Sequence, residues 1–261
     1  MARFFVDALP LEGTEYTLTG ENAEHAKVLR LKPGEAVTLC DGRGTDCVCA
    51  VEEGLRLRAG ASLPCPAEAR VRVSVYLAFP KGDKAEHVIQ KAVELGAAEI
   101  VLFPSRYCVS RPEGKALGKK LERWQKIARS AAEQSRRGII PPVRAADSYT
   151  QALTEAAQAE LPVLFYENES GYSLHDALAE FSVGTSIARP RTSDACPYKQ
   201  NQPAPTRVSL MTGAEGGFSE EEIARAKAAG MKICTLGPRI LRCETAPLAG
   251  LTAVMFALRE L

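Results

Sequence analysis

The sequence lacks any apolar run long enough to cross a membrane, and residues 1–13 show no signal-peptide pattern. These absences lead us to expect a cytoplasmic protein. No Cys-x-x-Cys pair occurs among the eight cysteines, and the three histidines stand apart from the cysteines and from one another. Because the ligand spacing of a zinc site is therefore missing, we expect no metal and free, mostly buried thiols.

Net charge is also nearly absent, since 33 basic residues face 32 acidic ones. The overall charge of +1 therefore gives no indication of a nucleic-acid partner. Its distribution is uneven, because residues 106–144 hold eleven basic and three acidic residues. Such a local surplus fits a surface that faces phosphates, and it fits a solvated helix face equally well.

The hydrophobic pattern changes near residue 70. Residues 1–69 contain short strand-like runs and turns around one short helix at 24–31, which predicts a compact barrel-like domain. From residue 70 to 261, strands alternate with helices, which predicts an α/β domain whose mainly parallel sheet is covered on both faces. Residues 182–206 have almost no large apolar side chains and are predicted to be a flexible insertion.

Individual elements can be placed from the same pattern. In the first domain the expected strands include 36–40 and 46–51, separated by the turn 41–44. In the second domain the expected strands are 71–79, 99–103, 162–166, 207–212 and 232–236. The expected helices are 85–95, 115–137, 149–159, 174–181, 220–229 and 246–261. Ser219 and Glu222 are spaced as a capping box at the start of one of these helices.

Two glycine-containing segments lie where an expected strand passes into a helix. They are Met211–Phe218 and Leu236–Ala246. The first has the spacing of neither a Walker loop nor a dinucleotide fingerprint. Ligands of α/β proteins bind beyond the carboxyl ends of strands, so both segments are candidate binding loops. For the first, a structural turn is an equal alternative, and for the second a surface pair of Arg242 with Glu244.

The residues of these segments resemble a known family. Gly213–Ser219, Leu236–Arg242 and Glu244–Ala246 are similar to the bacterial 16S ribosomal RNA uridine-N3 methyltransferases of the SPOUT superfamily. Ala214 departs from the family pattern, which has proline there, and the insertion at 182–206 is a second departure. The resemblance extends over most of the remaining chain, through residues 25–31, 41–44, 90–96 and 131–137.

The resemblance implies a fold and an activity. The fold would be α/β, with a C-terminal trefoil-knotted SPOUT domain at 70–261 and an N-terminal PUA-like β-barrel at 1–69 that binds RNA. The activity would be S-adenosylmethionine-dependent methylation of uridine N3 in 16S ribosomal RNA of the small subunit, by a homodimer. Arg242, and after it Arg136, would stabilise the uridinate, because preorganised cations favour developing negative charge. Glu244 would position Arg242 or accept the proton.

Binding residues follow from the same resemblance by position. The cofactor would be held by three loops, which contain Phe165, Tyr166, Met211, Thr212, Gly213, Glu215, Gly216, Gly217, Leu236, Gly237, Ile240, Leu241, Arg242, Thr245 and Ala246. The RNA would be contacted by Arg3, Lys27, Arg30, Lys91, Gln134, Arg136 and Arg137.

Two other functions compete with this interpretation. One is a ribose 2′-O-methyltransferase of the same superfamily, although such relatives carry different loop motifs. The other is a non-catalytic RNA-binding ribosome assembly factor whose cofactor site has decayed. The intact glycines at 213, 216, 217 and 237 and the presence of Arg242 argue against decay.

Overall fold

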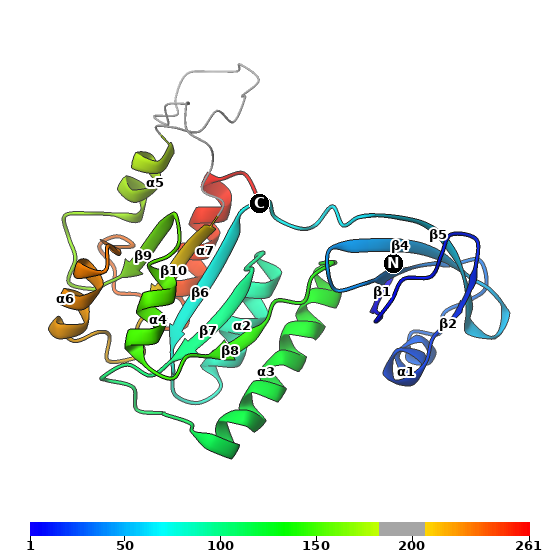
Figure 1. Cartoon of the computed structure of the whole chain (residues 1–261), viewed down its shortest axis with the longest axis horizontal. Coiled ribbons are helices and arrows are strands. Elements are labelled where there is room, and N and C mark those ends of the chain that lie inside the picture. Colours follow the sequence, from blue (N-terminus) through cyan, green and yellow to red (C-terminus); the bar gives the residue numbers. More distant parts are fainter. Residues whose placement is uncertain (183–206) are drawn as a thin grey trace. The chain divides into compact units, whose positions relative to one another are not determined.

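The structure is a computed structural model that describes residues 1–182 and 207–261 (Figure 1). The predicted insertion lies outside the described residues except for Ser182, which ends a helix. The chain divides into two compact units. The first unit comprises Met1–Glu68 and Arg129–Ile140, and the second comprises Ala69–Ala128 and Pro141–Leu261.

A five-stranded sheet with the strand order β1-β3-β4-β5-β2 forms the first unit. β1 pairs in parallel with β3, and the other neighbours are antiparallel. Alternate side chains of these strands, among them Phe4, Leu39 and Leu57, are fully buried and form the core, as expected for a sheet with one covered face. The elements are β1 (Ala2–Phe5), β2 (Glu15–Thr17), α1 (Gly20–Val28), β3 (Ala36–Cys40), β4 (Thr45–Val51), the 3₁₀ turn η1 (Glu53–Leu55) and β5 (Arg56–Pro64).

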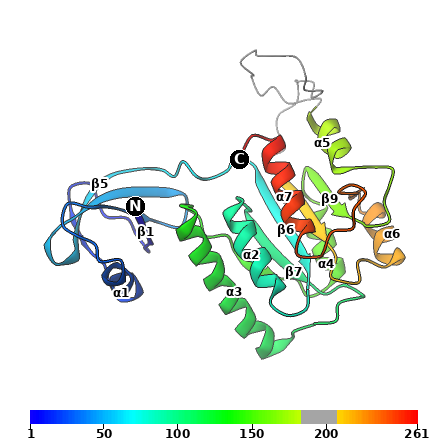
Figure 2. The same cartoon turned by 180° about the vertical axis from the view of Figure 1, so that it is seen from behind.

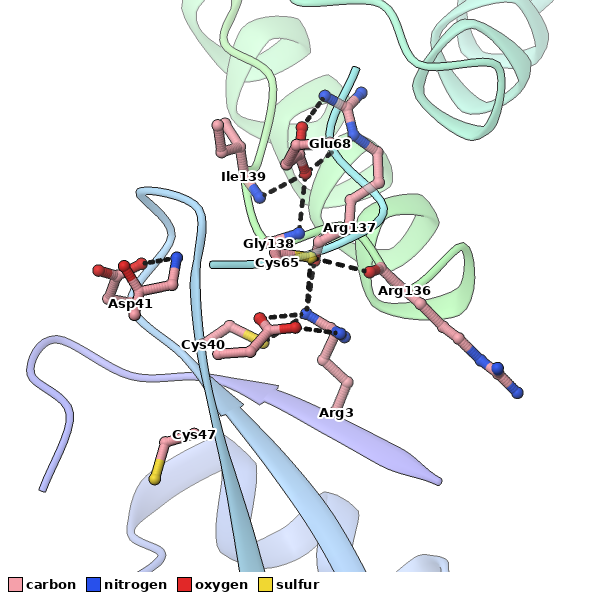
Figure 3. Close-up of polar contacts among 12 residues, drawn as sticks. Arg3, Cys40, Asp41, Cys47, Cys65, Glu68, Arg136, Arg137, Gly138 and Ile139 are labelled. Atoms are coloured by element: carbon pink, nitrogen blue, oxygen red, sulfur yellow. Dashed lines mark hydrogen bonds and ion pairs between the residues drawn. The ribbon is translucent and has the colours of Figure 1, made fainter. Parts of the chain in front are cut away.

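The second stretch of the first unit is held by one carboxylate. Glu68 Oε1 accepts hydrogen bonds from the backbone N–H groups of Gly138 at 2.8 Å and Ile139 at 3.0 Å (Figure 3). Its Oε2 pairs with Arg137 Nη2 at 2.8 Å. The chain leaving the long helix is therefore fixed to the end of the first stretch, because three of its N–H donors converge on the one carboxylate of Glu68.

A buried ion pair lies beside this contact. Arg3 makes two parallel hydrogen bonds to Asp46, at 2.7 and 2.8 Å, and both side chains are about nine-tenths buried. Arg3 Nη1 also donates to the carbonyl of Arg137 at 3.2 Å. Such a pair is strongly destabilising when one partner alone is lost, because an uncompensated charge stays buried.

We expect Asp46→Ala to lower the free energy of opening the first unit by about 3 kcal/mol, because Arg3 would lose its counter-charge. Hydrogen exchange of the amides of β3 and β4 measures this. Trp124, the single tryptophan, lies in the second unit, so its fluorescence should be unaffected and serves as an internal control. Glu15→Ala breaks an exposed pair with Arg58 and should cost less. Equal losses for the two variants would contradict this account.

The second unit is built on a six-stranded sheet in which every pairing is parallel. The strand order is β11-β9-β10-β6-β7-β8. The buried strands are rich in Val, Ile and Leu, which is typical of parallel sheets covered on both faces. Their bounds are β6 (Arg72–Ala78), β7 (Glu99–Phe103), β8 (Val143–Ala145), β9 (Leu161–Phe165), β10 (Arg207–Thr212) and β11 (Lys232–Cys234).

Helices cover both faces of this sheet. α2 and α7 lie together on one face, with α7 packed on β6 and β10, and α4 lies on the opposite face (Figures 1 and 2). The helices are α2 (Lys84–Glu94), α3 (Gly114–Gln134), α4 (Tyr149–Ala156), α5 (Leu174–Ser182), α6 (Glu220–Ala228) and α7 (Ala246–Ala257). The predicted parallel α/β arrangement is thus confirmed. Strand order does not define how the chain is threaded, so the knot stays a prediction.

Candidate functional site

A cavity lies beyond the carboxyl ends of three neighbouring strands. β9 pairs with both β10 and β11 in parallel, so the loops that follow these strands meet at one edge of the sheet. The cavity has a volume of about 910 Å³, within the range of small-molecule sites. Its lining comes from residues 165–167, 169–170, 212–217, 235–243 and 246, together with Lys84.

The loop after β10 is compact because of its glycines. The backbone N–H of Gly217 donates to the carbonyl of Ala214 at 3.0 Å, which closes a tight turn. Gly217 has a φ of +65°, and a Cβ there would overlap the carboxylate of Glu167. Directly after the turn, Ser219 and Glu222 form the predicted capping box that begins α6. The backbone of this loop is therefore presented to the cavity by a fixed helix start.

The loop after β11 carries Arg242 and Glu244, whereas Arg136, the third candidate catalytic residue, lies in the first unit. Gly237 has a φ of +109°, and its N–H donates to Thr235 Oγ1 at 3.1 Å. At the other end, the carbonyl of Arg242 accepts from the N–H groups of Thr245 and Ala246 and so begins α7. The Arg242 side chain is exposed and makes no ion pair with the residues that the structure describes. Its guanidinium is thus available to a ligand of the cavity.

Glu244 pairs with Lys84 rather than with Arg242. Lys84 Nζ lies 3.3 Å from Glu244 Oε2 and 2.9 Å from Glu215 Oε1. A hydrogen bond from its own backbone N–H lowers the pKa of Glu244; burial opposes this, and hydrogen bonds from Cys243 and Lys84 lower the pKa further. Burial alone would raise the pKa of Glu215, but hydrogen bonds from Lys84 and from backbone N–H groups outweigh it and lower the pKa to about 2.

Most of the predicted cofactor residues share this cavity. Met211 and Thr245 are the two that do not line it: Met211 is a fully buried residue of β10, and Thr245 is the N-cap residue of α7. Those that line it are Phe165, Tyr166, Thr212, Gly213, Glu215, Gly216, Gly217, Leu236, Gly237, Ile240, Leu241, Arg242 and Ala246. Lining residues that were not foreseen include Lys84, Glu167 and Arg239.

The predicted RNA contacts fall into three groups. Arg3 and Arg137 are buried in ion pairs with Asp46 and Glu68, so assigning them to RNA contact was wrong, because these pairs leave their guanidinium groups no free surface. Lys91 pairs with Glu94 on α2 at 2.8 Å. The remaining residues are exposed in the first unit: Lys27, Arg30, Gln134 and Arg136.

The basic segment at 106–144 is partly neutralised by acidic residues outside it. Arg123 pairs with Glu86 at 2.7 Å, and Arg144 pairs with Glu99 and Glu155. The cations left on α3 are four lysines, of which Lys120 lies over the ring of Trp124 at 5.6 Å. The surplus in the sequence therefore overstates the free positive charge of this surface.

In residues 1–182 and 207–261, no three His, Cys, Asp or Glu side chains are grouped as metal ligands. In the same residues, no helix is long and apolar enough to span a membrane.

Comparison with known proteins gives the same two-part architecture. Residues 67–255 match the family model of the RNA methyltransferase domain, and residues 18–54 match that of the RNA methyltransferase PUA domain. The chain is 32% identical to ribosomal RNA small subunit methyltransferase E of Bacillus subtilis, covering 98% of this chain and 96% of that protein. It is 34% identical to the enzyme of the same name from Mycobacterium bovis, with 96% and 90% covered.

Solved structures agree with these matches. The methyltransferase Lpg2936 of Legionella pneumophila, solved with bound S-adenosylmethionine, has a TM-score of 0.74 at 27% identity and covers 98% of this chain and 97% of that one. Ribosomal RNA small subunit methyltransferase E of Neisseria gonorrhoeae, bound to S-adenosylmethionine, has a TM-score of 0.69 at 30% identity, with 98% and 97% covered. Fold and site thus define an α/β RNA methyltransferase of the SPOUT class with an N-terminal PUA domain. Given this identity over nearly the full length, the chain belongs to the ribosomal RNA small subunit methyltransferase E family.

Proposed function

We propose that this protein transfers a methyl group from S-adenosylmethionine to N3 of a uridine in 16S ribosomal RNA of the small subunit. The observation that carries the proposal is that both glycine-containing loops line one cavity at the carboxyl edge of the parallel sheet. The names of its relatives support a small-subunit ribosomal RNA as substrate. We place the enzyme in the cytoplasm, where such RNA is assembled.

The cavity fits the cofactor in chemistry as well as in size. A Cβ at Gly216 would come within 2.6 Å of Tyr107, so the loop backbone can lie as it does only without a side chain there. Backbone groups of residues 212–217 and 236–241 would hold the adenosine portion, and the ring of Phe165 lies at the wall. When bound, the cofactor supplies a methyl group on a sulfonium, which is already activated, so we expect no metal requirement.

The residues beside the cavity then act on the uridine. N3 of a neutral uridine carries a proton, so it becomes nucleophilic as that proton leaves. The free guanidinium of Arg242 would stabilise the negative charge on O2 or O4, with donors already in place before reaction. Glu244, held as a carboxylate, would orient the acceptor or receive the N3 proton.

The first unit would bind the RNA. We assign this role to the domain of residues 1–69 together with residues 129–140, which belong to the same compact unit; the methyltransferase domain comprises the rest of residues 70–261. Arg30 and Arg136 are exposed, and both occupy the left-handed position that ends a helix, with φ of 54° and 63°. Glycine is the usual residue there, so each arginine is kept at a cost in backbone strain. The strain supports a role for the side chains, which phosphate contact would provide.

We expect Arg136→Gly to stabilise the protein by about 1 kcal/mol while weakening RNA binding, because the strain and the cation disappear together. Fluorescence anisotropy with a small-subunit RNA fragment, measured over a series of salt concentrations, tests the second effect. The slope of log affinity against log salt should fall in magnitude by about 1 for one lost phosphate contact. Unchanged affinity and slope would remove Arg136 from the RNA surface.

We also propose that the active protein is a homodimer. α7 is apolar except for Thr252, and its outer face exposes Phe256, which is 75% accessible. A helix that is hydrophobic all round is normally buried, and an exposed apolar face marks an interaction surface. Because α7 begins at Ala246, which lines the cavity, a second copy seated on this face would lie next to the cofactor loops.

The test of the proposed function is methyl transfer from labelled S-adenosylmethionine to small subunits from a strain that lacks this enzyme, followed by nucleoside analysis. We expect 3-methyluridine. Label on ribose would support 2′-O-methylation instead. Absence of both label and cofactor binding would support a non-catalytic assembly factor.

A further inference from the structure

Lys84 enters the cavity from a fourth loop, which the glycine motifs do not include. It is the first residue of α2, which follows β6, and β6 lies next to β10 in the sheet. The turn before α2 is therefore adjacent to the loop after β10. Consistent with this, the backbone N–H of Lys81 donates to the carboxylate of Glu215 at 3.1 Å.

The ammonium group of Lys84 joins two loops that are far apart in sequence. It donates to Glu215 Oε1 at 2.9 Å and lies 3.3 Å from Glu244 Oε2. It also lies 3.7 Å from the sulfur of Cys243, whose thiol in turn donates to Glu244 Oε2 at 3.3 Å. The three charged side chains are each about one-quarter to one-third exposed, so their pairing is not fully screened by water.

The position of Lys84 is unfavourable on local grounds. The first turn of a helix carries a partial positive charge, and cations there are destabilising whereas anions are favoured. The Asp83 side chain before it makes no capping hydrogen bond. The lysine is compensated by two carboxylates, each supplied by one of the two loops that line the cavity. This arrangement indicates that the charge serves the site rather than the helix.

We propose that Lys84 is a positioning residue of the methyl-transfer site, which ties the Gly213–Gly217 loop to the Leu236–Ala246 loop and orients Glu244 as a carboxylate beside Arg242. This inference rests on the proposed function, which makes the cavity a site of methyl transfer. It assigns Lys84 no contact with the reacting atoms: the residue acts through Glu215 and Glu244.

The contacts define what its loss would change. Glu244 faces the ammonium of Lys84 and the thiol of Cys243, and Glu215 lies on the other side of the same ammonium. Removing the cation leaves two carboxylates near each other, which favours protonation of one of them. The pKa of Glu244 should then rise, and the loop after β11 would lose its tie to the loop after β10.

The experiment compares Lys84→Met, Lys84→Arg and the wild-type protein, with Lys227→Met on the exposed face of α6 as the matched control. Carbon-13 NMR of labelled glutamate carboxyls follows the titration of Glu244 without cofactor or RNA. In Lys84→Met we expect the Glu244 midpoint at higher pH and kcat lower by about 10- to 100-fold, the loss typical of misplaced reacting groups. The acid limb of the kcat profile should move to higher pH, because the carboxylate form is lost earlier as pH falls. In Lys84→Arg the midpoint of the Glu244 titration should lie close to the wild-type value, because the positive charge is kept.

A double-mutant cycle keeps the inference falsifiable. In a Glu244→Gln background, Lys84→Met should cost less than about 3-fold in kcat, because residues that act together are not additive. If Lys84→Met leaves both the Glu244 titration and the pH profile at their wild-type positions, the inference is overturned, even if the protein is less stable. If Lys84→Met unfolds, the Glu215→Gln variant should still shift the pKa of Lys84 downward, and an unchanged value would overturn it. Failure of the wild-type protein to transfer methyl would instead overturn the proposed function, since the carboxyl titration does not depend on it.

Discussion

Replacing Arg242 with alanine is expected to reduce kcat by about 100- to 1000-fold while S-adenosylmethionine affinity changes by only a few fold. Loss of one preorganised donor to a developing oxyanion has an effect of this size. The structure gives a reason to expect a large change in kcat with little change in cofactor affinity. Arg242 contributes its backbone carbonyl to the start of α7, which alanine preserves, whereas its side chain makes no ion pair within the described residues.

Single-turnover methyl transfer and calorimetric titration with S-adenosylmethionine measure the two quantities. Arg242→Lys should give an intermediate rate, because it keeps the charge and loses the planar fork of donors. Arg225→Ala, an exposed arginine on α6, serves as the matched control. Normal turnover by Arg242→Ala would exclude its proposed role, and loss of cofactor binding would reassign it to the cofactor.

Replacing Phe256 with glutamate is expected to weaken dimerisation by about 100-fold or more and to abolish methyl transfer at concentrations where the variant is monomeric. A buried aromatic anchor contributes about 2 kcal/mol or more to an interface, and a charge introduced in its place adds a desolvation cost. Inside one chain the change should be tolerated, because the Phe256 side chain is 75% exposed. Its neighbours Met255 and Val254, in contrast, are buried in the second unit.

Sedimentation velocity over a concentration series gives the dimer affinity, and methyl transfer is assayed on the same samples. Leu11→Glu, which places the same charge at a residue 78% exposed in the first unit, should leave the oligomeric state unchanged. A Phe256→Glu protein that stays dimeric would exclude this face, and a fully active monomer would exclude the requirement for a dimer.

Elements with strong local signals could be predicted from the sequence. The capping box at Ser219 and the glycine at 230 bracket α6 correctly, and β10 lies at Arg207–Thr212 as expected. β1, β2 and β5 were missed, because their short runs become strands only through pairing with β3 and β4. The first helix begins four residues earlier than expected, at Gly20, since its single buried residue, Ala26, leaves almost no periodic pattern.

The site was predictable where one loop carries it and not where several loops meet. Both glycine motifs indicated the cavity, since the tight turn at Gly217 and the positive φ of Gly217 and Gly237 are local features of the motifs. Lys84 gave no such signal, because its partners lie about 130 and 160 residues away and are brought close by the adjacency of β6 and β10. Arg3 and Arg137 were misassigned for the same reason. The sequence does not show whether a basic residue has a carboxylate partner that is distant along the chain.

The discontinuity of the first unit has a consequence for how the protein is made. Its strands are complete in the chain by Glu68, but Arg137, Gly138 and Ile139, which satisfy that carboxylate, are synthesised roughly 70 residues later. At about 5–20 residues per second, the N-terminal sheet waits on the order of 4 to 14 s with Glu68 unpaired. The nascent first unit therefore lacks this tie until β6, β7 and the long helix α3 of the methyltransferase domain have been synthesised, so its last part is made after the second domain has begun.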